Sequence, residues 1–139
     1  MIRSSIAAAA VLLGTMSAVL APDDATAQTY GGPVAVVVAI PIPPGLTRAR
    51  IEALFVEQAP KYAAIPTLKQ KYFTINEETH RAGGIYLWTN ADAARAFFNQ
   101  AWHDRVKATY GADAEMTWFD APLIIEGKAG MAPAPPTRP

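Results

Sequence analysis

Hydrophobic and polar positions follow two different periods along the chain, which predicts a domain that mixes strands and helices. Residues 34–42 (VAVVVAIPI) form an apolar run rich in β-branched side chains, typical of a strand buried on both faces. Thr47 then stands where a helix N-cap is expected, and apolar side chains recur at helical spacing up to Tyr62. Pro60 lacks an amide donor, so we expect this helix to kink or restart there and Pro66 to close it.

The middle of the chain predicts an antiparallel hairpin. Residues 68–75 and 82–89 both have strand character, and a short polar turn joins them. Gly83 and Gly84 lie at the start of the second of these strands. Glycine inside a strand predicts a bulge or the close approach of another backbone.

The last third of the chain predicts a second helix followed by a final strand. Thr89 and Asp92 are spaced as in a capping box, and the pattern that follows predicts one helix up to about Tyr110. Residues 115–125 then have strand character, interrupted by Pro122. Because proline cannot donate to a strand ladder, we expect an edge strand or a bulge.

The order of these elements, β-α-β-β-α-β, predicts a ferredoxin-like α+β fold with a four-stranded antiparallel sheet and both helices on one sheet face. The other sheet face would be bare in a monomer. Apolar side chains nevertheless alternate onto both faces of the last strand, from Trp118 and Phe119 to residues 123–125. A second subunit packed sheet on sheet would cover the bare face, so we expect a homodimer that forms an α/β barrel.

The two ends of the chain have compositions that are not typical of a folded domain. Residues 1–27 combine a positive start, an uncharged apolar stretch over residues 6–20 and an A-x-A site that ends at Ala27. This pattern predicts a cleaved signal peptide, with a signal anchor or an N-terminal core helix as the alternative. Residues 127–139 predict a proline-rich disordered tail. The folded domain is then expected over residues 28–126, exported, periplasmic and free of the membrane after cleavage.

The overall composition excludes several classes of function. Lys and Arg number 12 against 12 Asp and Glu, so a general nucleic-acid-binding surface is not expected. The absence of Cys excludes a disulfide framework, a thiolate metal site and a cysteine nucleophile. With two His in the whole chain, we expect no metal site.

Several short phrases carry a resemblance to a known family. They are 81–89 (RAGGIYLWT), the Phe pair 97–98 on the helix after it, 57–62 (EQAPKY), 65–68 (IPTL) and the pair 72–73 (YF). In these phrases the chain resembles the YdhR-type monooxygenase family, which is similar to the small dimeric α/β-barrel proteins. Those proteins include cofactor-independent monooxygenases of antibiotic biosynthesis. The resemblance implies a dimeric barrel and a monooxygenase that needs no cofactor.

The chemistry available to such a site is an aromatic pocket with one base and a few polar groups. His103 is the candidate base, because its ordinary pKa lies near neutrality. Arg81 is the candidate for stabilising an oxyanion, with Arg105 and Lys71 as alternatives, and Tyr72 is a candidate hydrogen-bond donor to the substrate. Each of these side chains also fits a structural role in the core, the interface or the surface. The aromatic side chains expected to bind the substrate are Tyr62, Tyr86, Trp88, Trp102 and Trp118.

Three functions fit the sequence. The first is an exported, cofactor-independent monooxygenase that acts on a small phenol- or hydroquinone-like compound. The second is a non-catalytic dimeric barrel that binds a small apolar or aromatic ligand. The third is a heme-binding or heme-degrading relative, with His103 as axial ligand and Trp88 near the heme.

Overall fold

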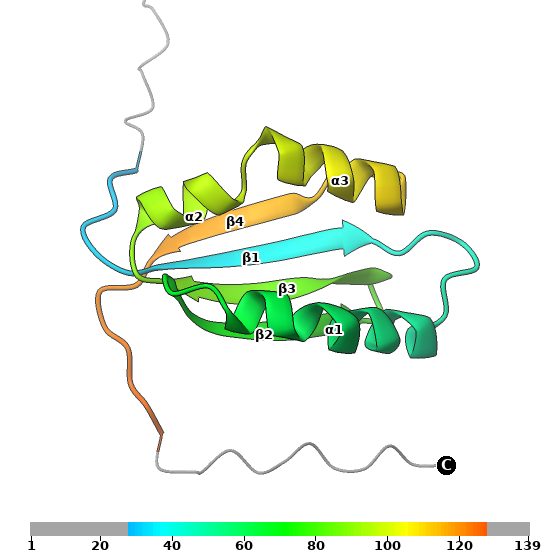
Figure 1. Cartoon of the computed structure of the whole chain (residues 1–139), viewed down its shortest axis with the longest axis horizontal. Helices are drawn as coiled ribbons and strands as arrows, with labels where there is room; N and C mark the ends of the chain where they lie inside the picture. The colour runs from blue at the N-terminus through cyan, green and yellow to red at the C-terminus, as the bar shows by residue number, and fades with distance from the viewer. Residues whose placement is uncertain (1–27, 128–139) are drawn as a thin grey trace, which may run out of the picture.

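The computed structural model describes residues 28–127. The expected signal peptide, residues 1–27, and residues 128–139 of the expected tail lie outside the described residues, so the predicted domain boundaries remain predictions. None of the helices within 28–127 has the length and hydropathy to cross a membrane. The elements are β1 (Val34–Pro41), α1 (Arg48–Ala63), β2 (Leu68–Asn76), β3 (Arg81–Trp88), α2 (Ala91–Phe97), α3 (Gln100–Tyr110) and β4 (Glu115–Asp120) (Figure 1).

The four strands form one antiparallel sheet in the order β2-β3-β1-β4, which confirms the ferredoxin-like prediction (Figure 1). In this register Val36 lies beside Tyr86 on one side and Trp118 on the other. The last strand is an edge strand, as Pro122 indicates, but it ends at Asp120 and is shorter than expected. The chain then bends at Pro122, outside the strand, rather than at a bulge within it.

All three helices cover the same face of the sheet. The ring of Tyr86 on β3 lies 5.9 Å from Tyr62 of α1 and 5.1 Å from Phe98, which follows α2, measured between ring centroids. On β1, every second side chain from Val34 to Ile40 faces this core and is buried. The side chains between them are only half-buried, so the expectation that this strand is buried on both faces is wrong for the single chain.

The first helix begins as predicted but does not break at its proline. The hydroxyl oxygen of Thr47 accepts a hydrogen bond from the amide of Arg50 at 3.3 Å, which confirms the N-cap. The helix then runs through Pro60 and ends at Ala63, before Pro66. A proline removes one helical hydrogen bond, and this one lies in the last turn, where little helix remains to be disrupted.

The predicted second helix is two helices, and its cap is not the predicted one. Asn90, rather than Thr89, accepts a hydrogen bond from the amide of Ala93 at 2.8 Å and begins α2. Asn99 then accepts one from the amide of Trp102 at 3.0 Å and begins α3. A second N-cap residue inside the apolar pattern thus ends one helix and starts the next in a new direction.

The two glycines of β3 mark the close approach of neighbouring strands. A Cβ on Gly83 would overlap the carbonyl oxygen of Val38 on β1, and one on Gly84 would lie 2.7 Å from the carbonyl oxygen of Tyr72 on β2. The prediction of close approach is confirmed. The irregularity in strand pairing lies instead in β2, between Leu68 and Gln70.

Candidate active site

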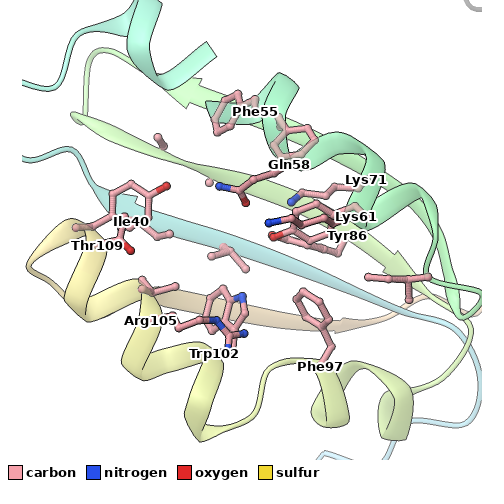
Figure 2. A pocket seen from close by; sticks show the side chains of 18 residues that line it. Ile40, Phe55, Gln58, Lys61, Lys71, Tyr86, Phe97, Trp102, Arg105 and Thr109 are labelled. Carbon is pink, nitrogen blue, oxygen red and sulfur yellow. The ribbon is translucent and has the colours of Figure 1, made fainter. Parts of the chain in front are cut away.

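A cavity of about 360 Å³ lies over the helix-covered face of the sheet, with α1 on one side and α2 and α3 on the other (Figure 2). Its floor includes Val38 and Ile40 of β1 and Ala82 of β3. The volume falls within the range of small-molecule sites. The aromatic side chains that line it are Phe55, Tyr62, Phe73, Tyr86, Phe97, Trp102 and Tyr110.

Three of these aromatic rings enclose the amine of Lys71. Strand alternation places it on the helix side of β2, directly opposite Tyr86 of β3 in the strand pairing. Its Nζ lies 3.0 Å from the ring centroid of Tyr62, 3.9 Å from that of Phe73 and 4.5 Å from that of Tyr86. The amine therefore sits in a three-sided aromatic cage at the cavity wall.

Burial changes the acid–base chemistry of this amine. It lowers the pKa of Lys71 from 10.5 to about 6, because removing an ammonium from water disfavours its charged form. The ion pairs within residues 28–127 do not include Lys71, so no carboxylate there offsets the desolvation. At neutral pH the cavity thus contains an uncharged amine, which is able to accept a proton.

The tyrosines around the cavity remain protonated donors. Burial raises the pKa of Tyr62, which interactions with Tyr86 and Trp102 partly counteract. Burial also raises the pKa of Tyr86 well above its usual range, and that of Tyr110. The Tyr62 hydroxyl is therefore available to donate a hydrogen bond to a substrate oxygen, and none of these three hydroxyls competes with Lys71 for the role of base.

Three of the five predicted substrate-binding residues line the cavity: Tyr62, Tyr86 and Trp102. Trp88 lies outside the lining, fully buried in the core. Trp118 is also outside it, on β4, where its ring lies 6.0 Å from that of Phe98. The structure therefore brings together three of the predicted aromatic side chains and assigns the other two to packing.

The three predicted catalytic residues do not meet in the cavity. His103 packs edge-on against Trp102 on α3, at 5.0 Å between ring centroids, and is not part of the cavity lining. Tyr72 lies on the opposite face of the sheet and is 53% exposed. Arg81 begins β3 and pairs with Glu115 of β4 at 3.2 Å. Tyr72 and Arg81 lie on the uncovered sheet face and His103 lies on α3 outside the cavity lining, so the three do not meet in the cavity.

The residue that sequence reasoning undervalued is Lys71. From the sequence it is one of three candidate cations, without a preferred place. The available signal is strand alternation, which puts Lys71 on the same face as Phe73 and Ile75. Lysine next to apolar side chains on a strand face is a signal, because lysine is rarely buried without a partner.

The described residues offer no metal centre. Within residues 28–127, no three His, Cys, Asp or Glu side chains lie close enough together to hold a metal ion. The polar side chains of the cavity wall include Gln58 of α1 and Thr109 of α3. These offer hydrogen bonds rather than metal coordination.

A known protein family matches most of the described chain. The family model described as "Putative mono-oxygenase ydhR" matches residues 42–122. A comparison with curated proteins gives no match.

Solved structures share the fold at low sequence identity. A putative antibiotic biosynthesis monooxygenase from Caulobacter crescentus is 20% identical with a TM-score of 0.52, over 66% of this chain and 92% of that one. SnoaB, a cofactor-independent oxygenase from Streptomyces nogalater, is 19% identical with a TM-score of 0.51, over 70% of this chain and 100% of that one. A dimeric ferredoxin-like protein of unknown function from Thermobifida fusca is 18% identical with a TM-score of 0.50, over 68% of this chain and 96% of that one. These likenesses show the fold.

Proposed function

The chain belongs to the ydhR mono-oxygenase family, and from that membership we propose that it oxygenates a phenol- or hydroquinone-like compound with O₂ and without a bound cofactor. The observation that carries this proposal is the Lys71 amine inside the aromatic cavity. The similarity of the fold to a cofactor-independent oxygenase supports the absence of a cofactor. The aromatic walls are suited to hold a flat ring by stacking and edge contacts.

In the proposed reaction, Lys71 is the general base. Its Nζ accepts the proton of the substrate hydroxyl, and the ammonium that forms stabilises the phenolate beside it. The phenolate is electron-rich enough to pass one electron to O₂. Tyr62 stays protonated and donates a hydrogen bond toward the substrate oxygen, while the buried Tyr86 interacts with Tyr62.

The proposed oxygenation balances without an external reductant. The superoxide and the substrate radical combine at a ring carbon that carries hydrogen, and a proton from Lys71 completes a hydroperoxide. That carbon then loses its hydrogen as a proton while the O–O bond breaks and hydroxide leaves. The products are a quinone and one water, so one oxygen atom of O₂ enters the substrate and the other leaves as water. The apolar walls exclude solvent from the intermediates.

The proposed base is Lys71 rather than His103, the base expected from the sequence. His103 does not line the cavity, whereas Lys71 contacts its aromatic walls directly. The same geometry removes His103 as an axial ligand for a heme bound in this cavity. A heme-dependent function therefore has no support from the placement of this histidine.

We expect O₂ uptake with a naphthol or an alkyl hydroquinone to follow the ionisation of Lys71. Because the neutral amine is the active form and its pKa is about 6, the rate should rise about tenfold from pH 5 to pH 7 and then level off. The other charged side chains that line the cavity are Lys61 and Arg105. An oxygen electrode measures the rate after subtraction of the uncatalysed reaction, and EDTA should leave it unchanged.

Two results of that experiment would contradict the proposal. A rate that falls as the pH rises from 5 to 7 would require a protonated group as the active form. A rate abolished by EDTA and restored by a metal ion would replace base catalysis with metal chemistry.

We also propose that the chain is exported and works in the periplasm. The support is the pattern of residues 1–27, which lie outside the described part of the chain. N-terminal sequencing of the protein recovered from the periplasm of an expressing Gram-negative host should begin at Gln28. Recovery of the full-length chain from the membrane fraction would favour the signal-anchor alternative.

We propose, third, that two copies form a homodimer with their sheets face to face. The uncovered sheet face carries exposed apolar side chains, among them Ile85 and Phe119. The protein of similar fold from Thermobifida fusca is dimeric, which supports a dimer. The cavity lies on the opposite, helix-covered face of each sheet, so each copy would keep its own site.

A further inference from the structure

Most lysines and arginines of the described residues either pair with a carboxylate or line the cavity. Residues 28–127 contain nine of them, and five pair with a carboxylate within 4.0 Å. Of the four others in this part of the chain, Lys69 lies outside the cavity lining, and Lys61, Lys71 and Arg105 lie within it. Within residues 28–127, two charged side chains without a carboxylate partner, Lys61 and Arg105, thus lie at one place in the fold, together with the buried amine of Lys71.

The lining of the cavity contains no Asp or Glu. Its two outer cations come from opposite walls, Lys61 from α1 and Arg105 from α3 (Figure 2). The charge of Arg105 acts across to Tyr62 of α1, where it lowers the pKa of the tyrosine against the larger effect of burial. Both outer cations are on exposed positions of their helices, whereas Lys71 is enclosed by aromatic rings. The cavity lining therefore combines an amine enclosed by aromatic rings with two cations on exposed helix positions.

We infer that the ligand of this cavity is an aromatic hydroxy acid, with a carboxylate held between Lys61 and Arg105 and its hydroxyl directed toward Lys71. The hydroxyl end of this assignment rests on the proposed function; the carboxylate end rests on the two outer cations alone. A guanidinium and an ammonium on opposite walls suit a planar carboxylate, which has acceptor positions on both oxygens. The aromatic rings between these ends suit the ring system that joins the two groups.

A matched pair of ligands tests this inference. The probes 6-hydroxy-2-naphthoate and 2-naphthol share the ring system and the hydroxyl and differ in the carboxylate at the far end. Titration of the purified protein under anaerobic conditions, followed by ligand fluorescence, measures binding without turnover. We expect the acid to bind about tenfold more tightly than the neutral naphthol at pH 7.5, from two partly exposed charge contacts.

The double variant K61Q/R105Q should abolish this preference. The acid should lose about tenfold in affinity, and 2-naphthol should bind as before, which also shows that the cavity is intact. The double variant K69Q/K107Q removes the same net charge outside the cavity lining and should keep the preference. Rising salt should weaken binding of the acid to the wild-type protein and leave 2-naphthol unaffected.

Equal affinities of the two probes for the wild-type protein would overturn the inference. An equal loss of the preference in K61Q/R105Q and K69Q/K107Q would also overturn it, because the preference would then arise from the net charge of the protein. The test does not depend on catalysis. If the preference holds and no O₂ is consumed, the proposed function fails and the acid site stands. If O₂ is consumed but the acid is not preferred, the acid site fails and the proposed function stands.

Discussion

Replacing Lys71 by methionine should lower the rate of O₂ uptake at pH 7.5 at least a hundredfold and leave the protein folded. A positioned general base contributes about 10²- to 10⁴-fold, and methionine has similar length without a group that accepts a proton. The aromatic cage of Tyr62, Phe73 and Tyr86 should receive its apolar side chain well. Steady-state kcat, measured in an oxygen electrode, gives the loss. Lys69→Met, two residues away on an exposed position of β2, should leave kcat within about twofold and serves as the control.

The stability of the same variant separates catalysis from structure. The pKa of Lys71 falls from 10.5 to about 6 on folding, so between these values the unfolded chain binds more protons than the folded one. The free energy of unfolding of the wild-type protein should therefore rise as the pH increases above about 6. At pH 7 the buried lysine still destabilises the folded state, so Lys71→Met should melt at a higher temperature than the wild-type protein. The raised pKa values of Tyr62, Tyr86 and Tyr110 act in the opposite direction only above about pH 10. A wild-type kcat in Lys71→Met would mean that another group accepts the proton of the substrate hydroxyl. A fall in both kcat and melting temperature would mean that Lys71 has a structural role.

The sequence predicts the fold well because the elements here carry strong local signals. The β-branched run of β1 and the Thr47 cap of α1 each have a single favoured local conformation. The pattern between Asn90 and Tyr110 is less informative. Apolar spacing continues across Asn99, so only the orientation of its side chain, which caps a new helix, reveals the break. That orientation depends on packing against the sheet, which a local pattern does not contain.

The site is less predictable than the fold because it depends on register and on the helix-covered face. Hydropathy leaves the two faces of β2 nearly equivalent, with Tyr72 on one and Lys71 on the other. Once pairing with β3 directs Tyr86 to the helices, the same register carries Lys71 inward and Tyr72 outward. A search for a group with an ordinary pKa near 7 selects His103, whereas the fold produces a base by burying a lysine.

Replacing Ile85 by arginine should convert the proposed homodimer to a monomer. Ile85 lies at the middle of the uncovered face, beside Val37 of β1 and Tyr72 of β2, and is 40% exposed in the single chain. Phe119 on β4, 48% exposed, extends the same apolar surface. An arginine there would be buried without a partner in a sheet-on-sheet dimer and repeated by symmetry in the second copy. The dimer dissociation constant should rise on the order of a hundredfold or more.

A second exposed apolar residue provides the matched control for this change. Val56 is 74% exposed on α1, on the helix side of the sheet, so Val56→Arg adds the same charge away from the proposed interface. Sedimentation equilibrium over micromolar concentrations should give a dimer for the wild-type protein and for Val56→Arg, and a monomer for Ile85→Arg. A wild-type monomer at those concentrations would rule out the proposed dimer. Equal dissociation constants for the two variants would place the interface away from the uncovered sheet face. In the proposed dimer the uncovered sheet faces of the two copies would form the core of a barrel, and the half-buried alternate side chains of β1 would be interior residues of the assembly.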